Sequence, residues 1–397
     1  MSGNMFPQRT QAAIDALAPT LRFFEESGWY RRLSEPDVSD FTIGNPHEMP
    51  PPGFVDALAR NVVPEHIHWY AYHTNEPASR RALAASLRAW RGIEFREEDV
   101  FLTNGATAGL HVVFETIVGP GDEVIFMSPP WLQYESMILL AGGTPVRLRI
   151  NLATYDLDLD GLERAITPST RAVIINSPHN PTGKIYPPDT LKRLAGIVAA
   201  ASKRNGRTVY LVSDESYSRI VFDGRAYHSP TEFYFETFLV YTYGKVLLTP
   251  GQRIGFIALP PGMQEKDRMR TAIESMQMLA GWAFPNALLQ HAFADLDRIS
   301  VDMAQLQKKR DRLVTALREM GYETSLPEGT FYVLVKSPLA DDIAFVRMLA
   351  DYKIFCIPGS LMDLPGWFRI SLTANDAMIE RSLPGFAEAS RTALSGR

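Results

Sequence analysis

Lys245 and Arg253 stand in otherwise apolar or small surroundings, in the stretch VYTYGKVLLTPGQRIGF (240–256). A charge that leaves water needs a partner or a chemical use, because desolvation disfavours its ionised form. A lysine in a partly apolar pocket becomes a nucleophile toward carbonyls, whereas arginine stays charged and binds phosphate with its planar fork. A lysine after a strand is also typical of a surface group that reaches back to water. Other segments must therefore decide between these interpretations.

Two segments that follow β-rich runs have the composition of ligand-binding turns. In residues 103–107, TNGAT, the small residues let backbone N–H groups and a helix dipole approach an anion such as a phosphate. In residues 176–183, NSPHNPTG, two prolines and a glycine fix an unusual backbone, and Asn180 can offer its amide to a ligand. The first segment also fits an ordinary helix cap, and the second fits a connecting turn.

A third segment, SDESY (213–217), supplies a carboxylate and a phenol. Asp214 ends a buried strand, and a carboxylate buried there is costly unless a cation pairs with it. Tyr217 can reach the same pocket. A helix cap with a surface tyrosine is the competing interpretation. A phosphate cradle, a carboxylate, a phenol, an amide, an amine and a guanidinium together are the groups needed to hold pyridoxal 5'-phosphate.

The elements that must position these groups alternate from about residue 100 onward, as a doubly wound α/β sheet requires. Continuous apolar runs predict buried strands, and amphipathic stretches such as 190–203 predict helices among them. The expected strands are 100–103, 123–127, 172–176, 208–212, 238–241 and 253–258. In such a sheet, ligands bind outside the carboxyl ends of the strands.

A different pattern begins after residue 285. We expect a long helical region to about residue 320, then strand 330–335, helix 340–351, strand 367–372 and a closing helix, which suggests a smaller α+β domain. Helical spacing of Ile14, Leu17, Leu21 and Phe24 predicts a packed N-terminal helix. The predicted organisation is 1–50 as a segment contributing to the small domain, 51–285 as the large cofactor-binding domain, and 286–397 as the interdomain helix and C-terminal small domain.

Composition narrows the function classes. The 397 residues are 46% hydrophobic and 21% charged, with a net charge of −5 and no long runs of like charge, which disfavours nucleic acid and anionic membrane as partners. The single cysteine, Cys356, forms neither an internal disulfide nor a thiolate metal site, and no apolar run approaches a membrane span, so we expect a cytoplasmic protein. On a strand, His66 and His68 would share a face, but no further ligand pattern supports them, so we interpret them as solvated loop histidines and predict no metal.

Taken together, the motifs resemble the fold-type I, class I/II aminotransferases, an aspartate aminotransferase-like family, with matches from about residue 41 to 373. NSPHNPTG is similar to that family's Asn-Pro-x-Asn-Pro-Thr-Gly motif, SDESY to its Asp-x-x-Tyr, and TYGK through GQRIG to its Schiff-base lysine motif. The resemblance implies a large domain with a mostly parallel seven-stranded sheet sandwiched by helices, plus a smaller α+β domain.

The resemblance also assigns cofactor roles position by position. Lys245 would form the Schiff base with pyridoxal 5'-phosphate, Asp214 would pair with the pyridinium nitrogen, and Asn180 and Tyr217 would hydrogen-bond the ring 3'-oxygen. Trp131 would stack on the ring. The remaining residues would surround the phosphate, and they are Gly105, Ala106, Thr107, Thr242, Arg253 and, from the neighbouring subunit of a homodimer, Tyr70.

For the substrate, the resemblance implies that Arg369 clamps the α-carboxylate, with the backbone of Gly44 and the amide of Asn180 beside it. The expected reaction moves an amino group between an α-amino acid and a 2-oxo acid. The alternative is another reaction of the same cofactor, by an amino acid decarboxylase, a β- or γ-lyase, a cyclase or an oxidase. A nicotinamide-dependent dehydrogenase lacks its glycine motif here, and a non-catalytic scaffold would not need the retained amine, carboxylate and arginine.

Three departures from the family pattern bear on reaction type and substrate. Gly244 stands where many relatives carry serine, and Asn75 replaces a glycine usual after the position of Tyr70. The segment GWAFPN places Trp282 and Phe284 where dicarboxylate-specific members have a polar loop, which hints at an apolar or mixed pocket, although both are equally compatible with the core.

Overall fold

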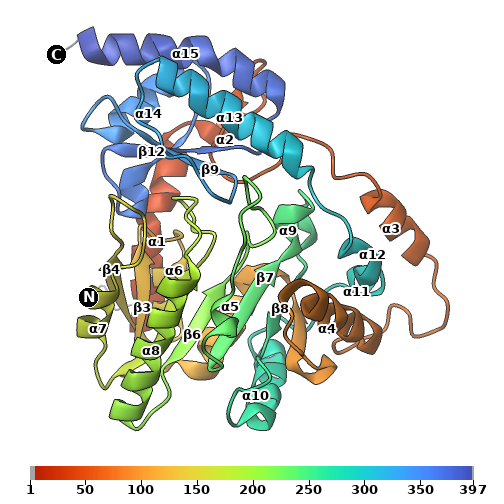
Figure 1. The fold of residues 1–397 in the computed structure, drawn as a ribbon. Coiled ribbons are helices and arrows are strands. Elements are labelled where there is room, and N and C mark those ends of the chain that lie inside the picture. The colour runs from red at the N-terminus through yellow and green to blue at the C-terminus, as the bar shows by residue number, and fades with distance from the viewer. Residues whose placement is uncertain (1–4, 396–397) are drawn as a thin grey trace.

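A seven-stranded sheet forms the centre of the computed structural model, which describes residues 5–395 (Figure 1). Its strands, in spatial order, are β2 (Val100–Thr103), β8 (Gly255–Ala258), β7 (Thr237–Thr242), β6 (Tyr210–Asp214), β5 (Thr170–Asn176), β3 (Glu123–Ser128) and β4 (Thr144–Arg149). The strands from β7 to β4 pair in parallel, and β8 runs antiparallel to both of its neighbours. The predicted α/β class with a mostly parallel seven-stranded sheet is confirmed.

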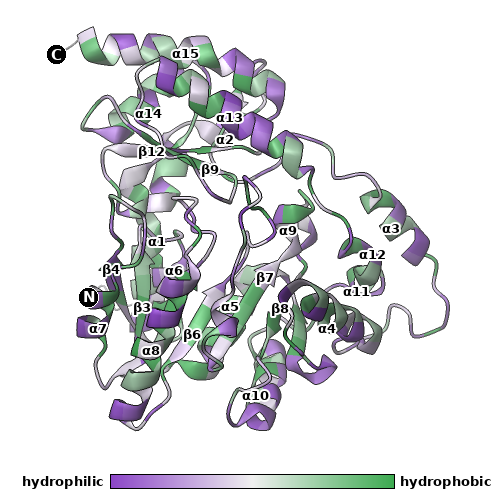
Figure 2. Ribbon diagram, in the orientation of Figure 1, coloured by the Kyte–Doolittle hydropathy of each residue, from purple (hydrophilic) through white to green (hydrophobic). Residues whose placement is uncertain are grey.

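Both faces of this sheet are covered by helices, which explains its continuous apolar strands. Along β3, Val124 and Phe126 pack on one face with α5, α6 and α10, whereas Ile125 and Met127 pack on the other face with α7 and α8. Helices α3, α4, α11 and α12 complete the second face near β2 and β8. Figure 2 shows hydrophobic residues along the central strands and hydrophilic ones on surrounding helices such as α10 and α13.

The helices up to residue 296 connect and cover the strands. Their bounds are α1 (Gln8–Glu26), α2 (Trp29–Arg32), α3 (Phe54–Asn61), α4 (Pro77–Arg91), α5 (Gly105–Ile117), α6 (Tyr134–Leu140), α7 (Leu159–Ala165), α8 (Pro188–Asn205), α9 (Tyr243–Val246), α10 (Lys266–Leu279), α11 (Ala287–His291) and α12 (Phe293–Leu296).

The C-terminal third forms a second layer, above the central sheet in Figure 1. It contains α13 (Met303–Glu319), α14 (Asp342–Asp351) and α15 (Asp376–Ser395), with an antiparallel sheet of β11 (Ile357–Pro358), β12 (Trp367–Ser371) and β9 (Tyr332–Lys336). Strand β1 (Ser39–Asp40) pairs in parallel with β10 (Ile354–Phe355), so the N-terminal segment joins this layer. The exact domain boundaries at residues 50 and 285 stay predictions.

Two local features differ from the expectation. The helical region after residue 285 is not continuous, because α12 ends at Leu296 and Asp302 caps a new helix by accepting from the Gln305 backbone N–H at 3.0 Å. Strand β4 was not predicted. His66 and His68 lie in a loop between α3 and α4, as expected.

Two absences among the described residues bear on function. Among residues 5–395, no helix is both long and apolar enough to cross a membrane. Within the same range, no group of three or more histidine, cysteine, aspartate or glutamate side chains is arranged to hold a metal ion.

Candidate active site

The predicted site residues converge because of strand direction. Asn176 and Asp214 end the parallel strands β5 and β6 side by side, and Thr242 ends β7 at the same edge. Since β8 is antiparallel, its first residue, Gly255, pairs with Thr242, which brings the preceding Arg253 to this edge. One pocket thus receives groups from segments far apart in the sequence.

Lys245 projects into this pocket from the short helix α9, whose cap is Thr242 accepting from the Gly244 backbone N–H at 3.3 Å. Glycines at two positions allow neighbouring groups to approach closely in this region. A Cβ at Gly44 would lie 3.5 Å from Lys245 Nζ and 2.9 Å from the Tyr332 hydroxyl, and a Cβ at Gly244 would lie 2.9 Å from Pro250 Cα. A serine at position 244 would therefore crowd Pro250.

The opposite end of the pocket is built to bind an anion. Helix α5 begins at Gly105, so the free N–H groups and the positive end of the dipole of its first turn lie beside Ala106 and Thr107, which line the pocket. The guanidinium of Arg253 packs so closely against Gly105 that a Cβ there would lie 2.9 Å from one of its nitrogens, and the φ of +80° at Gly105 also favours glycine. Burial lowers the pKa of Arg253.

Asp214 supplies a carboxylate that is 5% exposed. Its Oδ1 accepts hydrogen bonds from the backbone N–H and hydroxyl of Ser216, at 3.1 and 2.6 Å, and its Oδ2 accepts one from the Tyr134 hydroxyl at 2.6 Å. Burial raises the pKa of Asp214, while these hydrogen bonds and the charge of Lys245 oppose the rise. The carboxylate is therefore held in one orientation by three donors.

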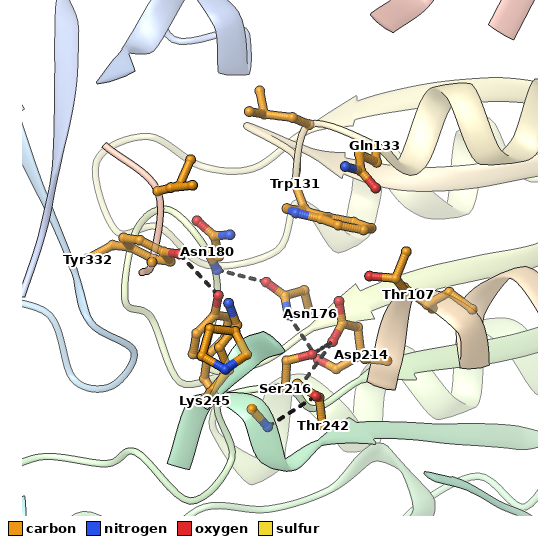
Figure 3. A pocket seen from close by; sticks show the side chains of 18 of the residues that line it. Thr107, Trp131, Gln133, Asn176, Asn180, Asp214, Ser216, Thr242, Lys245 and Tyr332 are labelled. Carbon is orange, nitrogen blue, oxygen red and sulfur yellow. Dashed lines mark hydrogen bonds between the residues drawn. The ribbon is translucent and has the colours of Figure 1, made fainter. Parts of the chain in front are cut away.

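An open space separates Trp131 from the groups beneath it (Figure 3). Its indole lies on one side, with Asp214 and Thr242 on the other, while Asn180 and Thr107 lie at opposite ends. The backbone N–H of Asn180 donates to Asn176 Oδ1 at 2.7 Å, which fixes the turn. A flat ring bound in this space would contact the indole on one face.

Arg369 lies across the pocket from the anion-binding end and is 4% exposed. Its terminal nitrogens donate to Asn180 Oδ1 at 3.0 Å and to the Thr42 carbonyl at 2.9 Å, and the guanidinium carbon lies 3.9 Å from the centre of the Tyr332 ring. Its Nε is buried without a hydrogen-bond partner among the described residues. A buried donor of this kind is costly unless a ligand satisfies it.

Two phenols lie between Arg369 and Lys245. The Tyr217 hydroxyl donates to the Tyr332 hydroxyl at 3.3 Å. Burial and the neighbouring Tyr332 raise the pKa of Tyr217. Burial alone would raise the pKa of Tyr332 as well, but the charges of Arg369 and Lys245 outweigh it and lower that pKa. Tyr217 is thus the proton donor of the pair.

The sequence did not reveal three of these residues. Tyr134 lies three positions after Trp131 near the start of α6, so helical spacing was a signal that could have linked them. Ser216 follows Asp214 by two residues, a spacing typical of a hydroxyl that bonds a preceding carboxylate. Tyr332 gave no local signal, because its place beside Arg369 depends on the pairing of β9 with β12.

Other predicted positions lie outside the pocket. Tyr70 is 51% exposed in the loop between α3 and α4, where its hydroxyl donates to the Val62 carbonyl, so it does not act in its own chain's pocket. Asn75 is buried and its Nδ2 donates to Gln277 Oε1 at 3.2 Å, a contact within the scaffold. Trp282 and Phe284 do not line the pocket, and their carbonyls accept from Asn104.

Comparisons with known proteins agree with this geometry. Residues 36–384 match the family model for aminotransferase class I and II. A probable aspartate/prephenate aminotransferase from Thermus aquaticus is 30% identical over 358 residues, which cover 89% of this chain and 91% of the relative. A probable N-acetyl-LL-diaminopimelate aminotransferase from Bacillus subtilis is 28% identical over 373 residues, 90% of this chain and 92% of the relative.

Solved structures show the same architecture. An amino transferase from Eubacterium rectale superposes with a TM-score of 0.90 at 28% identity, covering 98% of this chain and 99% of that one. An aspartate aminotransferase from Thermus thermophilus, solved with maleate, gives a TM-score of 0.81 at 26% identity and covers 98% of this chain and 100% of the other. The chain belongs to the class I and II aminotransferases.

Proposed function

We propose that the pocket binds pyridoxal 5'-phosphate and that Lys245 carries it covalently during amino-group transfer between an α-amino acid and a 2-oxo acid. The observation that carries this proposal is that one pocket brings Lys245 together with two separate candidate anion sites, one at Arg253 and one at Arg369. A cofactor with a phosphate at one end and a substrate with an α-carboxylate at the other would satisfy both sites.

The residues present fit this cofactor. The α5 N-terminus with Gly105, Ala106, Thr107, Thr242 and Arg253 would hold the phosphate, and Trp131 would cover the ring. Asp214 would keep a proton on the pyridinium nitrogen, because an ionised carboxylate held by three donors stabilises a facing cation. Asn180 and Tyr217 would donate hydrogen bonds to the ring oxygen.

When bound, the cofactor supplies an aldehyde that accepts the amine and a protonated ring that withdraws electrons from the substrate. Arg369 would position the α-carboxylate through its unsatisfied Nε, beside Gly44. The free amine of Lys245 would remove the proton from the substrate Cα and return it during the reverse half of the reaction. Tyr217 would keep its own proton in this step, since its pKa lies well above the usual value.

Transamination is the favoured outcome because the similar proteins are named as aminotransferases. Decarboxylation, β- or γ-elimination, cyclisation and oxidation would leave the cofactor in its aldehyde form. A homodimer, in which Tyr70 of each chain would reach the phosphate of the other, is part of the same proposal. A cytoplasmic location stays a prediction from composition.

Borohydride reduction of the cofactor-loaded protein, followed by peptide mapping, tests the proposal directly. We expect the cofactor attached to the peptide that contains Lys245, and no attachment in Lys245→Met. Lys184→Met, which alters a half-buried lysine outside the pocket, is the matched control and should retain the adduct. A protein that takes up the cofactor without an adduct at position 245 would refute the assignment.

A further inference from the structure

The charged groups in the pocket suggest which substrates it takes, an inference that rests on the proposed function. Among the described residues that line it, the cations are Lys245, Arg253 and Arg369, and the anion is Asp214. Each of the four has a partner in the scheme above, namely the cofactor aldehyde, the phosphate, the substrate α-carboxylate and the ring nitrogen. The part of the lining that this chain supplies therefore contains no further charge for a substrate side chain.

The remaining wall carries no charge and is largely apolar, with Thr20 and Gln133 among its polar members, and it comes from several elements. Helix α1 contributes one face to it, at positions spaced three and four residues apart, and the other contributors precede α6, follow β1 or lie in β11. The uncharged residues of this wall that carry the argument are Leu17, Thr20, Phe24, Ile43, Leu132 and Ile357.

Burial distinguishes these residues from accidental surface groups. Ile357 is fully buried, and Leu17, Phe24, Ile43 and Leu132 are half-buried. On α1, Leu17 and Phe24 line the pocket and are only half-buried, so a bound side chain that reaches them would cover more of their surface. Apolar contact of this kind favours a substrate in proportion to the apolar area removed from water.

We propose that the substrate side chain is neutral and predominantly apolar, in contrast to the aspartate named for several relatives. A second carboxylate placed against this wall would lose its hydration without gaining a cation from this chain, which disfavours an ionised group in that position. A lysine or arginine side chain would be disfavoured for the same reason, because Asp214 is already paired.

Two non-reacting carboxylates of similar size separate side-chain recognition from chemistry. 4-Methylpentanoate carries an apolar end and glutarate a second carboxylate, and both present one carboxylate to Arg369. Titration of the cofactor-loaded protein, followed by the absorbance of the bound cofactor, should give a Kd for 4-methylpentanoate at least about 100-fold below that for glutarate, since an unpaired buried charge costs more than a missing methylene. An equal or lower Kd for glutarate would overturn the proposal.

Single-turnover reaction with amino donors gives the second readout. L-Leucine, L-methionine and L-phenylalanine should convert the bound cofactor to its amine form faster than L-aspartate and L-glutamate at equal concentration. Faster conversion by aspartate or glutamate would overturn the neutral-substrate proposal but leave the Lys245 adduct intact. Absence of the adduct would instead refute the proposed function, so the two failures are distinguishable.

Leu132 offers a matched pair of variants, because it lines the pocket and is only half-buried. Leu132→Lys adds a cation to the wall and should lower the Kd for glutarate relative to that for 4-methylpentanoate by about tenfold or more, the scale of one favourable charge pair. Leu132→Met keeps the wall apolar and should leave the ratio unchanged. A ratio that is the same in both variants would contradict the placement of the substrate side chain beside Leu132.

Discussion

The Tyr134 hydroxyl lies 2.6 Å from Asp214 Oδ2 and donates a hydrogen bond to it, while Ser216 occupies Oδ1. Burial and the nearby Asp214 charge raise the pKa of Tyr134 well above its usual value, so the phenol keeps its proton. Tyr134 comes from α6, which follows Trp131. The same short segment therefore places the indole that would cover the cofactor ring and fixes the carboxylate that would face the ring nitrogen.

Removing this hydroxyl should reduce activity without unfolding the protein. In Tyr134→Phe we expect kcat to fall about 10- to 100-fold, because a hydrogen bond to a charged group contributes about 1.5–3 kcal/mol. Tyr186→Phe is the matched control, since the Tyr186 hydroxyl is buried without a partner among the described residues. Steady-state turnover and thermal melts of both variants check this. An unchanged kcat in Tyr134→Phe would mean that Ser216 alone suffices to orient Asp214.

Asp214→Asn should separate function from stability. Burial raises the pKa of Asp214, so the folded protein favours the protonated carboxyl more than the unfolded chain does. The stability contribution of this group is therefore present below the unfolded pKa of about 3.9 and decreases as the pH rises toward the folded pKa. At pH 7 the variant should be at least as stable as the wild type, whereas turnover should fall by about 10³-fold, since a charge aimed at the reacting system is lost.

Denaturant unfolding at pH 4 and pH 7, alongside turnover, tests this prediction. The free energy of unfolding of the variant, minus that of the wild type, should be larger at pH 7 than at pH 4. A variant that is less stable at pH 7 would show that Asp214 stabilises the fold in its charged form. Near-normal turnover would remove Asp214 from the proposed chemistry.

Much of the central sheet was predictable, because strands buried on both faces read as continuous apolar runs. Strand β4 was not, since it lies at the sheet edge and its residues Arg147 and Arg149 face outward among half-buried neighbours. The interruption of the helical region between α12 and α13 was also not predictable from the sequence. Arg219 and Tyr243 hold Asp297 through side-chain hydrogen bonds of 2.6 Å, and such long-range contacts leave no periodic signal.

The site residues also fall into those that the sequence reveals and those that only the fold reveals. Groups at strand ends, such as Asp214 and Lys245, could be collected from the sequence because parallel strands end at one edge of a sheet. The neighbours that tune them come from elsewhere in the chain. Tyr332 reaches the pocket from a strand of the C-terminal layer, and the apolar wall on α1 required knowing where that helix packs.

Arg369→Lys should weaken binding of the amino donor and leave cofactor binding intact. Lysine lacks the planar fork that contacts Asn180 and Thr42 and stacks on Tyr332. We expect the half-saturating donor concentration to rise roughly 100-fold, as for loss of a hydrogen bond between charged groups worth about 3 kcal/mol. Arg381→Lys, at an exposed arginine that bonds backbone carbonyls, is the control. Loss of the cofactor in Arg369→Lys would assign this arginine to the wrong end of the pocket.

Arg91→Met should destabilise the fold beneath the site. Arg91 forms a buried ion pair with Glu215, the residue after Asp214, and its guanidinium stacks on Trp90 and Tyr227. Burial raises the pKa of Glu215, and Arg91 opposes that rise. Removing Arg91 leaves a buried carboxylate without its cation, so the free energy of unfolding should fall by about 3–5 kcal/mol.

The double variant Arg91→Met/Glu215→Gln separates the lost ion pair from lost packing. The introduced glutamine amide would still accept hydrogen bonds from Ser213 and Ser229, whose hydroxyls now bond Glu215, and it carries no charge. We expect the double variant to recover most of the stability lost in Arg91→Met, measured by denaturant unfolding at pH 7. If it recovers none, the stacking of Arg91 between two aromatic rings, and not its charge, supports the strand that carries Asp214.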